Sequence, residues 1–346
     1  LRPCALCPRH GNSGGRPDRP CPDLEPDSTR DHGGNIDSAV ARFGGTDWID
    51  LSTGINRAPY PLPDLPPEVW TMLPTQSAKQ ALLRAAQSAY GTQAPILALA
   101  GAQAAIQMIP RLFAPKTARV LGPTYNEHAA CLRAAGWQVQ EVSRLAHLAG
   151  ADLAVVVNPN NPDGASYSPA DLLALGAQVG QLVVDESFAD AQAPLSLAAQ
   201  AGGNLLVLRS FGKFYGLAGL RLGFVLGDTA AIQALDAMAG PWPVSGAALH
   251  IGALALADTA WAQATTARLR AEAVQADALA EAAGWQPLGG TELFRLYDTP
   301  DAQSAQDRLA RHQIWSRIFP YSQRWLRLGL PAGVAEWARL TQALAA

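Results

Sequence analysis

Charged residues are scarce in this sequence: they make up 16% of its 346 residues, against a usual share of about 25%. Disordered chains are rich in charge and poor in apolar residues, whereas 49% of this chain is hydrophobic, so disorder of the whole chain is excluded. A net charge of −3 and an isoelectric point of about 6.1 argue against a general nucleic-acid-binding protein. At roughly 150 residues per domain, the length predicts about two domains.

Long apolar runs and a cysteine framework are also missing. The best membrane-span candidate, residues 217–227, is shorter than the roughly 18 residues that a span needs, and it contains Arg221. No apolar stretch follows Arg2, so no signal peptide is predicted. Four cysteines do not make a disulfide framework, and the reducing cytoplasm is the expected compartment.

Residues 1–30 are dense in proline and glycine and show no apolar periodicity. Their possible zinc ligands are Cys4, Cys7, His10 and Cys21, but the spacing fits none of the paired zinc patterns well. We predict a disordered tail, or sequence upstream of the true start, and no metal site.

The remainder of the chain has an α/β pattern. Short apolar runs are continuous rather than alternating, as in strands buried on both faces, and helical stretches separate them. The runs are residues 96–99, 119–121, 139–142, 153–157, 182–184, 205–208 and 222–226. One helix carries its apolar residues on a single face: Ala78, Leu82, Leu83, Ala86 and Tyr90. Another is expected to begin at Ser168-Pro169, with Asp171 in its first turn.

From about residue 230 the pattern changes to long Ala/Leu helices that end near Ala283. Two or three short strands and closing helices are expected to follow. The predicted organisation is an N-terminal arm (31–70), a large domain with a mostly parallel central sheet flanked by helices (71–240), and a smaller α+β domain (241–346).

Two loops follow predicted strands, at the edge where open α/β sheets bind ligands. Gly101-Ala102-Gln103 opens a helix, so its backbone N–H groups can face a phosphate, although a plain strand–helix turn explains it equally well. The segment NPNNPDG (158–164) has two X-Pro steps and a glycine, which force a fixed, irregular loop. Its asparagines can therefore present amide donors in a set place.

Two charged residues also stand at strand ends. Asp185 ends the run 182–184, where a carboxylate is costly without a partner, although a helix cap or surface acid is the alternative. Lys213 lies in a Gly-flanked loop after the run 205–208. Only two other lysines, Lys79 and Lys116, occur among 26 basic residues, so a lysine kept in an apolar stretch is informative. Desolvation lowers the pKa of a lysine and leaves its amine nucleophilic.

Together these features predict a pyridoxal 5'-phosphate site. This cofactor needs a lysine for its aldehyde, an acid for its pyridine nitrogen, cations and N–H groups for its phosphate, and a ring to stack on. Read in order, the residues that supply them are Gly101, Ala102, Gln103, Tyr125, Asn161, Asp185, Ser210, Lys213 and Arg221.

With these residues in place, the chain from about Asp31 onward resembles the fold-type I, class I/II aminotransferase-like enzymes. Histidinol-phosphate aminotransferases and the threonine-phosphate decarboxylases of cobalamin biosynthesis are the most similar branches. Three segments are most similar to the decarboxylases: DHGGN (31–35), LSTGIN (51–56) and SFGKFYGLAGLRLG (210–223).

The resemblance implies a role for each cofactor residue. Lys213 is the catalytic residue that bonds to the cofactor's aldehyde, and Asp185 pairs with the pyridinium. Tyr125, in GPTYNE (122–127), stacks on the ring, and Asn161 donates to the ring oxygen. The cofactor phosphate is held by Ser210, Arg221 and the amides of Ala102 and Gln103, beside Gly101.

The resemblance also implies the substrate site. Arg327, in WLRLG (325–329), holds the substrate carboxylate, and His32 and Arg317 hold its phosphate. The remaining residues implied for the substrate are Asn35, Gly54 and Asn161. The alternative for each arginine is a plain surface charge.

Three positions depart from the family pattern. Phe188 stands where many aminotransferases have a tyrosine that donates to the ring oxygen. Leu73 replaces a tyrosine that often reaches the partner subunit's cofactor phosphate, and Arg57 stands where proline is common.

The implied function is decarboxylation of L-threonine O-3-phosphate to (R)-1-amino-2-propanol O-2-phosphate and CO2, by a homodimer without nucleic-acid or membrane partners. A histidinol-phosphate-type aminotransferase is the first alternative, and a non-catalytic cofactor-binding relative is the second. The choice between decarboxylation and transamination depends on the resemblance, because no sequence feature gives the orientation of the bound substrate.

Overall fold

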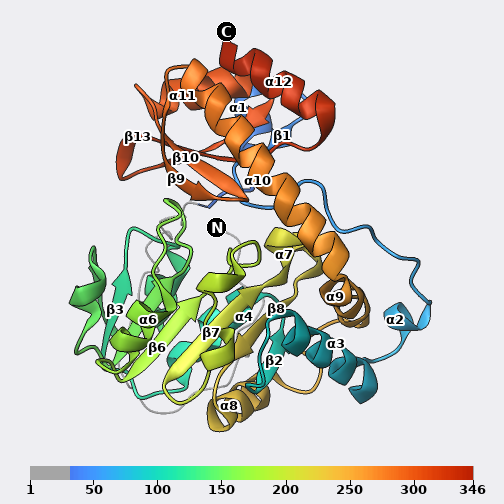
Figure 1. Cartoon of the computed structure of the whole chain (residues 1–346), viewed down its shortest axis with the longest axis vertical. Coiled ribbons are helices and arrows are strands. Elements are labelled where there is room, and N and C mark those ends of the chain that lie inside the picture. The colour runs from blue at the N-terminus through green and yellow to red at the C-terminus, as the bar shows by residue number, and fades with distance from the viewer. Residues whose placement is uncertain (1–31, 346) are drawn as a thin grey trace, which may run out of the picture. The chain divides into compact units, whose positions relative to one another are not determined.

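A computed structural model describes residues 32–345 of the chain (Figure 1). The predictions on residues 1–30 lie outside this range. A seven-stranded sheet forms its centre, in the order β2-β8-β7-β6-β5-β3-β4. The strands are β2 (Ile96–Leu99), β3 (Thr117–Leu121), β4 (Gln138–Val142), β5 (Leu153–Val157), β6 (Gln181–Asp185), β7 (Leu205–Ser210) and β8 (Gly223–Leu226).

This sheet confirms the prediction of a mostly parallel centre. Only β8 runs antiparallel to its neighbours, and each of the seven predicted apolar runs overlaps one strand. Every residue of β5 and β6 is buried, which explains why β5 is apolar throughout and β6 is apolar between Gln181 and Asp185.

Helices cover both faces of the sheet (Figure 1). Alternate strand residues point to opposite faces, so Val156 belongs to a buried cluster with residues of α3, α6 and α9, whereas Val155 belongs to a second cluster with residues of α4, α5 and α8. The helices of this part are α3 (Gln76–Ala89), α4 (Ala102–Met108), α5 (Glu127–Ala134), α6 (Pro169–Gly176), α7 (Phe211–Phe214), α8 (Thr229–Ala239) and α9 (Gly246–Ala257).

The predicted helix starts and faces agree with this structure. Leu82 and Ala86 are the buried residues of α3. The side chain of Ser168 caps α6 by accepting a hydrogen bond from the Asp171 N–H, and Pro169 occupies the first turn. Short 3-10 helices complete the connections: Ile109–Arg111, Leu145–Leu148, Ala193–Leu195, Ala198–Gln200 and Ala218–Leu220.

A second, antiparallel sheet lies in the C-terminal part, in the order β12-β13-β10-β9. Its strands are β9 (Gln286–Thr291), β10 (Phe294–Asp298), β12 (Arg317–Phe319) and β13 (Ser322–Gly329). A further parallel pair joins β1 (Ile49–Asp50) to β11 (Ile314–Trp315). The accompanying helices are α1 (Ile36–Phe43), α10 (Thr259–Ala282), α11 (Ala302–Arg311) and α12 (Gly333–Ala345), whereas α2 (Glu68–Thr71) packs against α9.

The prediction of two or three strands after residue 283 was wrong, because the chain forms five there, β9 to β13. β11 and β12 are only two and three residues long, which is too short to show a period. Most of β9 is half-buried or exposed, and it contains Gly289 and Gly290, so it lacks the apolar pattern of a buried strand.

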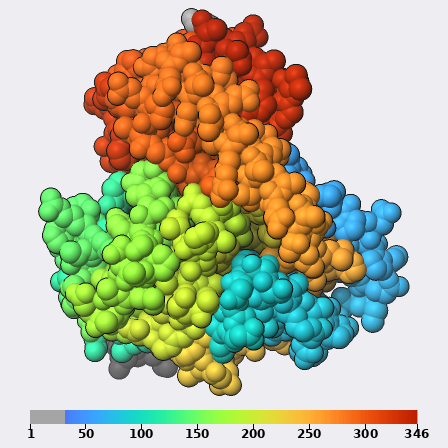
Figure 2. All heavy atoms as spheres, viewed as in Figure 1, coloured from blue at the N-terminus to red at the C-terminus, as the bar shows by residue number. Residues whose placement is uncertain are grey.

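Residues 49–60, here called the strap, connect the two sheets. At one end the N–H of Gly329 in β13 donates to the Leu51 carbonyl at 2.7 Å. Further along, the Asn56 N–H donates to the Lys213 carbonyl, and the Tyr60 N–H to the Tyr215 carbonyl, each at 2.9 Å. In Figure 2 the blue residues around the strap lie at the surface beside the orange of α10. The strap therefore ties the turn that carries Lys213 to the second sheet.

The predicted domain boundaries remain predictions. Helix α9 begins after the boundary at 240/241, yet it packs side by side with α3 of the preceding domain (Figure 1). None of the helices in residues 32–345 combines the length and the apolar character that a membrane crossing requires.

Candidate active site

One cavity of about 200 Å³ opens at the carboxyl ends of β5, β6 and β7. It is lined by every residue that the sequence predicts for the cofactor: Gly101, Ala102, Gln103, Tyr125, Asn161, Asp185, Ser210, Lys213 and Arg221. Ligands of open α/β sheets bind at this edge, where loops from several strands converge. The structure thus brings together residues from five separate parts of the sequence.

Lys213 lies on α7, a short helix that begins directly after β7, and not in a loop as predicted. A Cβ at Gly212 would lie 2.7 Å from the Ala218 Cα, so this helix packs tightly against the chain that follows. Burial, followed by the positive charge of Arg327, lowers the pKa of Lys213 to about 8, although Asp185 opposes the shift. Near neutral pH a larger fraction of this amine is unprotonated than in an exposed lysine.

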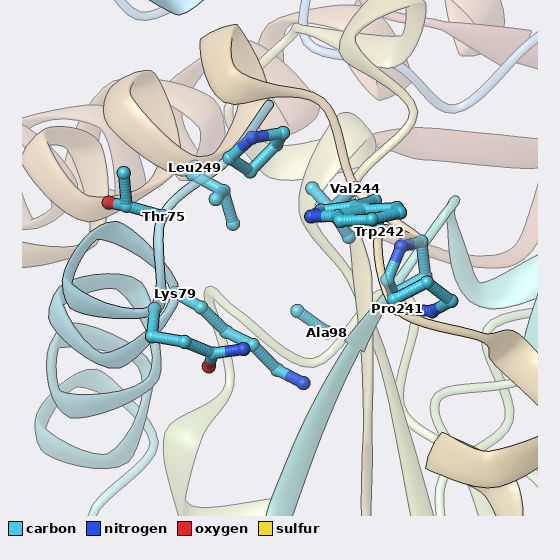
Figure 3. Close-up of a pocket in the computed structure, with 10 residues that line it drawn as sticks. Thr75, Lys79, Ala98, Pro241, Trp242, Val244 and Leu249 are labelled. Atoms are coloured by element: carbon cyan, nitrogen blue, oxygen red, sulfur yellow. The ribbon is translucent and has the colours of Figure 1, made fainter. Parts of the chain in front are cut away.

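The other two lysines lie elsewhere. Lys79 lines a separate pocket of about 20 Å³ beside Trp242, and its Nζ is 2.9 Å from Asp236 Oδ1 (Figure 3). Lys116 is exposed, with its Nζ 3.5 Å from Asp152 Oδ1. Lys213 is therefore the lysine that a ligand in the large cavity can reach.

Asp185 ends β6 and is fully buried. Its Oδ2 lies 2.8 Å from His128 Nε2, and its Oδ1 accepts from the Ser187 hydroxyl at 2.5 Å and the Ser187 N–H at 3.0 Å. Burial raises the pKa of a carboxyl, but the His128 and Ser187 hydrogen bonds outweigh it and hold the pKa of Asp185 below its ordinary value. The site therefore keeps Asp185 ionised.

A close-packed cradle forms around Gly101, which caps α4 with φ +79°. A Cβ there would lie 2.9 Å from Arg221 Nη2, and one at Gly223 would lie 2.3 Å from the Ala102 nitrogen. Arg221 itself adopts a left-handed conformation, with φ 52°. Only glycine leaves room for the guanidinium and the first N–H groups of α4 to approach one ligand, an arrangement that suits a phosphate.

Arg327 of β13 is buried and reaches across to the loop after β5. Its Nη1 donates to Asn161 Oδ1, and its Nη2 donates to the Ser52 carbonyl at 2.6 Å. Its Nε has no hydrogen-bond partner in the part of the chain that the structure describes. Burial and the neighbouring charge of Arg317, its partner on β12, lower the pKa of Arg327 to about 9. A carboxylate ligand would supply both the missing acceptor and a counter-charge.

The remaining predicted substrate residues are placed differently. The His32 Nε2 lies 3.1 Å from Glu127 Oε1, and the two rings of His32 and Tyr125 are 5.9 Å apart. Gly54 lies against Phe188, since a Cβ there would be 2.8 Å from the Phe188 ring. The side chain of Asn35 is exposed and caps α1 by accepting from the Ser38 N–H, so it does not reach the cavity. The role of Asn35 in substrate binding remains a prediction.

The structure shows the surroundings of the three positions that depart from the family pattern. Phe188 packs edge-on against Phe294, and Lys213 Nζ lies 5.8 Å from its ring centre, so no hydroxyl donor occupies this position. Leu73 is 64% exposed. Arg57 pairs with Glu336 through two hydrogen bonds, 2.8 Å and 2.5 Å long, which attach the strap to α12.

The sequence did not identify His128, Ser187, Ser52 or Glu127 as parts of the site. His128 and Glu127 share the first turn of α5 just after Tyr125, so their closeness to a predicted ring was the available signal. Ser187 follows Asp185 by two positions, a spacing at which a short hydroxyl side chain can donate to a carboxylate.

The fold and the cavity are those of the aminotransferases of classes I and II, and the chain belongs to this family, whose model matches residues 68–344. The threonine-phosphate decarboxylase of Sinorhizobium sp is 44% identical over 91% of this chain and 97% of its own length. The threonine-phosphate decarboxylase of Pseudomonas aeruginosa is 43% identical over the same shares. A histidinol-phosphate aminotransferase of Mycobacterium bovis is 32% identical over 72% of this chain and 74% of its own length.

Solved structures agree on the fold. Histidinol-phosphate aminotransferase from Sinorhizobium meliloti, solved in complex with pyridoxal-5'-phosphate, has a TM-score of 0.77 over 89% of this chain and 92% of its own. Its sequence identity is 21%, so this similarity concerns the fold alone. The cofactor of this chain is pyridoxal 5'-phosphate.

Proposed function

We propose that this protein decarboxylates L-threonine O-3-phosphate to (R)-1-amino-2-propanol O-2-phosphate and CO2, as a step of cobalamin biosynthesis. The observation that carries the proposal is the 44% identity to a threonine-phosphate decarboxylase over nearly the full length of both chains. The histidinol-phosphate aminotransferase is less similar and is matched over a smaller share. The chemistry of the cavity supports the same reading.

The residues of the cavity fit pyridoxal phosphate. Lys213 would bond to its aldehyde, Asp185 would face the pyridine nitrogen, and Tyr125 would stack on the ring. The cradle of Gly101, Ala102, Gln103, Ser210 and Arg221 would hold the phosphate, and Asn161 would donate to the ring oxygen. When bound, this cofactor supplies an electron sink for the bond that breaks at the substrate's α-carbon.

The chain's own residues influence which bond of the substrate breaks by orienting the substrate. Arg327, braced by Asn161 and the Ser52 carbonyl, would grip the substrate carboxylate and fix its direction. His32 and Arg317 would hold the phosphate at the other end of the substrate. A substrate fixed at both ends cannot rotate freely, and such positioning accelerates one reaction over its competitors.

The direct test compares two substrates. Purified, cofactor-loaded protein is expected to release CO2 from phosphothreonine at the same rate with and without a keto acid, because decarboxylation needs no amino acceptor. Histidinol phosphate with 2-oxoglutarate should give little product. Efficient turnover of histidinol phosphate that depends on the keto acid, with no CO2 from phosphothreonine, would assign the chain to the aminotransferases instead.

The two phosphate anchors give a second prediction. Arg317→Ala and His32→Ala should each raise the KM for phosphothreonine roughly ten-fold or more, because a charged hydrogen bond contributes ~1.5–3 kcal/mol. Unphosphorylated threonine should be a poor substrate of the wild type for the same reason. Steady-state kinetics measures both effects. Arg324→Ala is the control, since Arg324 is exposed on β13 and pairs with Asp298. An equal rise in KM in this control would contradict the assignment of Arg317 and His32 to the substrate phosphate.

We also propose a cytoplasmic homodimer. Several large apolar side chains of residues 62–73 and of one nearby loop are more than half exposed: Leu62, Trp70, Met72, Leu73 and Trp242. Thr75, just after this segment, and Trp242 line the same small pocket, so the segment and this loop are neighbours (Figure 3). Exposed apolar clusters of this kind mark subunit interfaces. Sedimentation at several protein concentrations measures the state, and a monomer throughout would contradict the proposal.

A further inference from the structure

A buried acid lies where the proposed function places two phosphates. Glu127 begins α5, and its side chain is only 8% exposed. Its neighbours Gln103 and Tyr125 line the cofactor cavity, and His32 is the proposed ligand of the substrate phosphate. A carboxylate near anions is unfavourable unless cations or donors separate them. Its position therefore requires an explanation that the cofactor roles do not give.

The hydrogen bonds of Glu127 form a chain between the two sites. Its Oε1 lies 3.1 Å from His32 Nε2, and its Oε2 accepts from Gln103 Nε2 at 3.0 Å. In turn, Gln103 Oε1 accepts from the Tyr125 hydroxyl at 3.1 Å. These contacts fix the direction of the Gln103 amide and the plane of the His32 ring, which also lies against Tyr125.

We propose that Glu127 is a positioning residue that aims His32 at the substrate phosphate and so selects phosphorylated substrates. This inference depends on the proposed function. An ionised carboxylate only accepts hydrogen bonds, so the His32 Nε2 must donate to Glu127. A phosphate also only accepts. The His32 ring can therefore serve both groups only with a proton on each nitrogen, its Nδ1–H being left for the phosphate.

The informative substitution is Glu127→Gln, which keeps the size of the side chain. Its amide oxygen can still accept from Gln103, but its amide nitrogen then faces His32 as a donor. The His32 Nε2 must become an acceptor, so the ring then faces the phosphate only through Nδ1–H and without a second N–H. We expect the affinity of the cofactor-loaded protein for inorganic phosphate, measured by phosphorus NMR titration, to fall roughly ten-fold.

Kinetics separates positioning from general damage. In Glu127→Gln the KM for phosphothreonine should rise about as much as the phosphate affinity falls, while kcat stays within roughly three-fold and kcat/KM for threonine is unchanged. Glu127→Asp retains the charge on a shorter side chain, so its KM for phosphothreonine should lie between those of the wild type and of Glu127→Gln. Glu141→Gln, a loss of an exposed carboxylate paired with Arg133, should change nothing.

A double-mutant cycle decides whether Glu127 acts through His32. If it does, His32→Ala with Glu127→Gln should bind phosphate no more weakly than His32→Ala alone, within about two-fold. Losses that multiply in the double variant, or a kcat that falls equally for threonine and phosphothreonine, would overturn the inference. The phosphate titration needs no turnover. If the wild type released no CO2 from phosphothreonine, the proposed function would be wrong, but the titration would still test the role of Glu127.

Discussion

Lys213→Ala is expected to abolish decarboxylation, with a fall of roughly a thousand-fold or more, equivalent to ~4 kcal/mol of barrier. Lys213 is the lysine that lines the large cavity, and burial brings its pKa to about 8, so part of it is already an unprotonated nucleophile near neutral pH. The cofactor-loaded wild-type protein should be yellow, and borohydride treatment should fix the cofactor to the peptide that contains Lys213. The variant should show no such covalent label.

The scarcity of lysine provides matched controls. Lys79→Ala removes an amine that pairs with Asp236, and Lys116→Ala removes an exposed one that lies near Asp152. Both variants should keep the label and the activity, with only the small change in stability that loss of a surface ion pair causes. Label recovered on either of these peptides in the wild type would refute the assignment of Lys213.

Asp185→Asn should reduce kcat by roughly a hundred-fold to a thousand-fold. Removing one partner of a buried charge pair costs ~3–5 kcal/mol, and each ~1.4 kcal/mol of barrier is a factor of ten in rate. Because the His128 and Ser187 hydrogen bonds hold the pKa of Asp185 below its ordinary value, its charge is present throughout the neutral range. The loss should therefore be the same across neutral pH and not appear only at one end of it.

The size of the side chain is unchanged in Asp185→Asn, so packing should be preserved. Thermal unfolding of the cofactor-free protein and its circular dichroism test this directly. Asp152→Asn is the control, because Asp152 is an exposed acid that caps the start of β3 through Thr117. Activity of Asp185→Asn within a few-fold of wild type would show that this carboxylate does not face the pyridine nitrogen.

The parts of the fold that the sequence predicted are those whose burial leaves a simple pattern. The stretch 153–157 is apolar at every position because both faces of β5 are covered, so the run alone identified the strand. In contrast, β13 is half-buried or exposed over its first four residues and buried over its last four, and it contains Arg324 and Arg327, so its sequence resembles a loop. Lys213 was expected in a loop because a four-residue helix such as α7 is too short for a periodic signal.

The same reasoning applies to the site. Residues at the ends of apolar strands, such as Asp185, were found because strand ends converge at one edge of a sheet. His128 and Glu127 were missed because their partners are remote in sequence: Asp185 is 57 positions from His128, and His32 is 95 positions from Glu127. No local pattern encodes such pairs, and only the tertiary packing creates them.

The strap has a consequence for how the protein is made. The contact between Arg327 and the Ser52 carbonyl joins residues 275 positions apart, and β1 pairs with β11 over a similar distance. Nearly the whole chain must therefore have left the ribosome before the strap can join the two sheets. A nascent chain that ends after β8 contains every strand of the central sheet, yet it lacks the arginine proposed to grip the carboxylate. Substrate selectivity would thus be acquired last during synthesis, after the central sheet has formed.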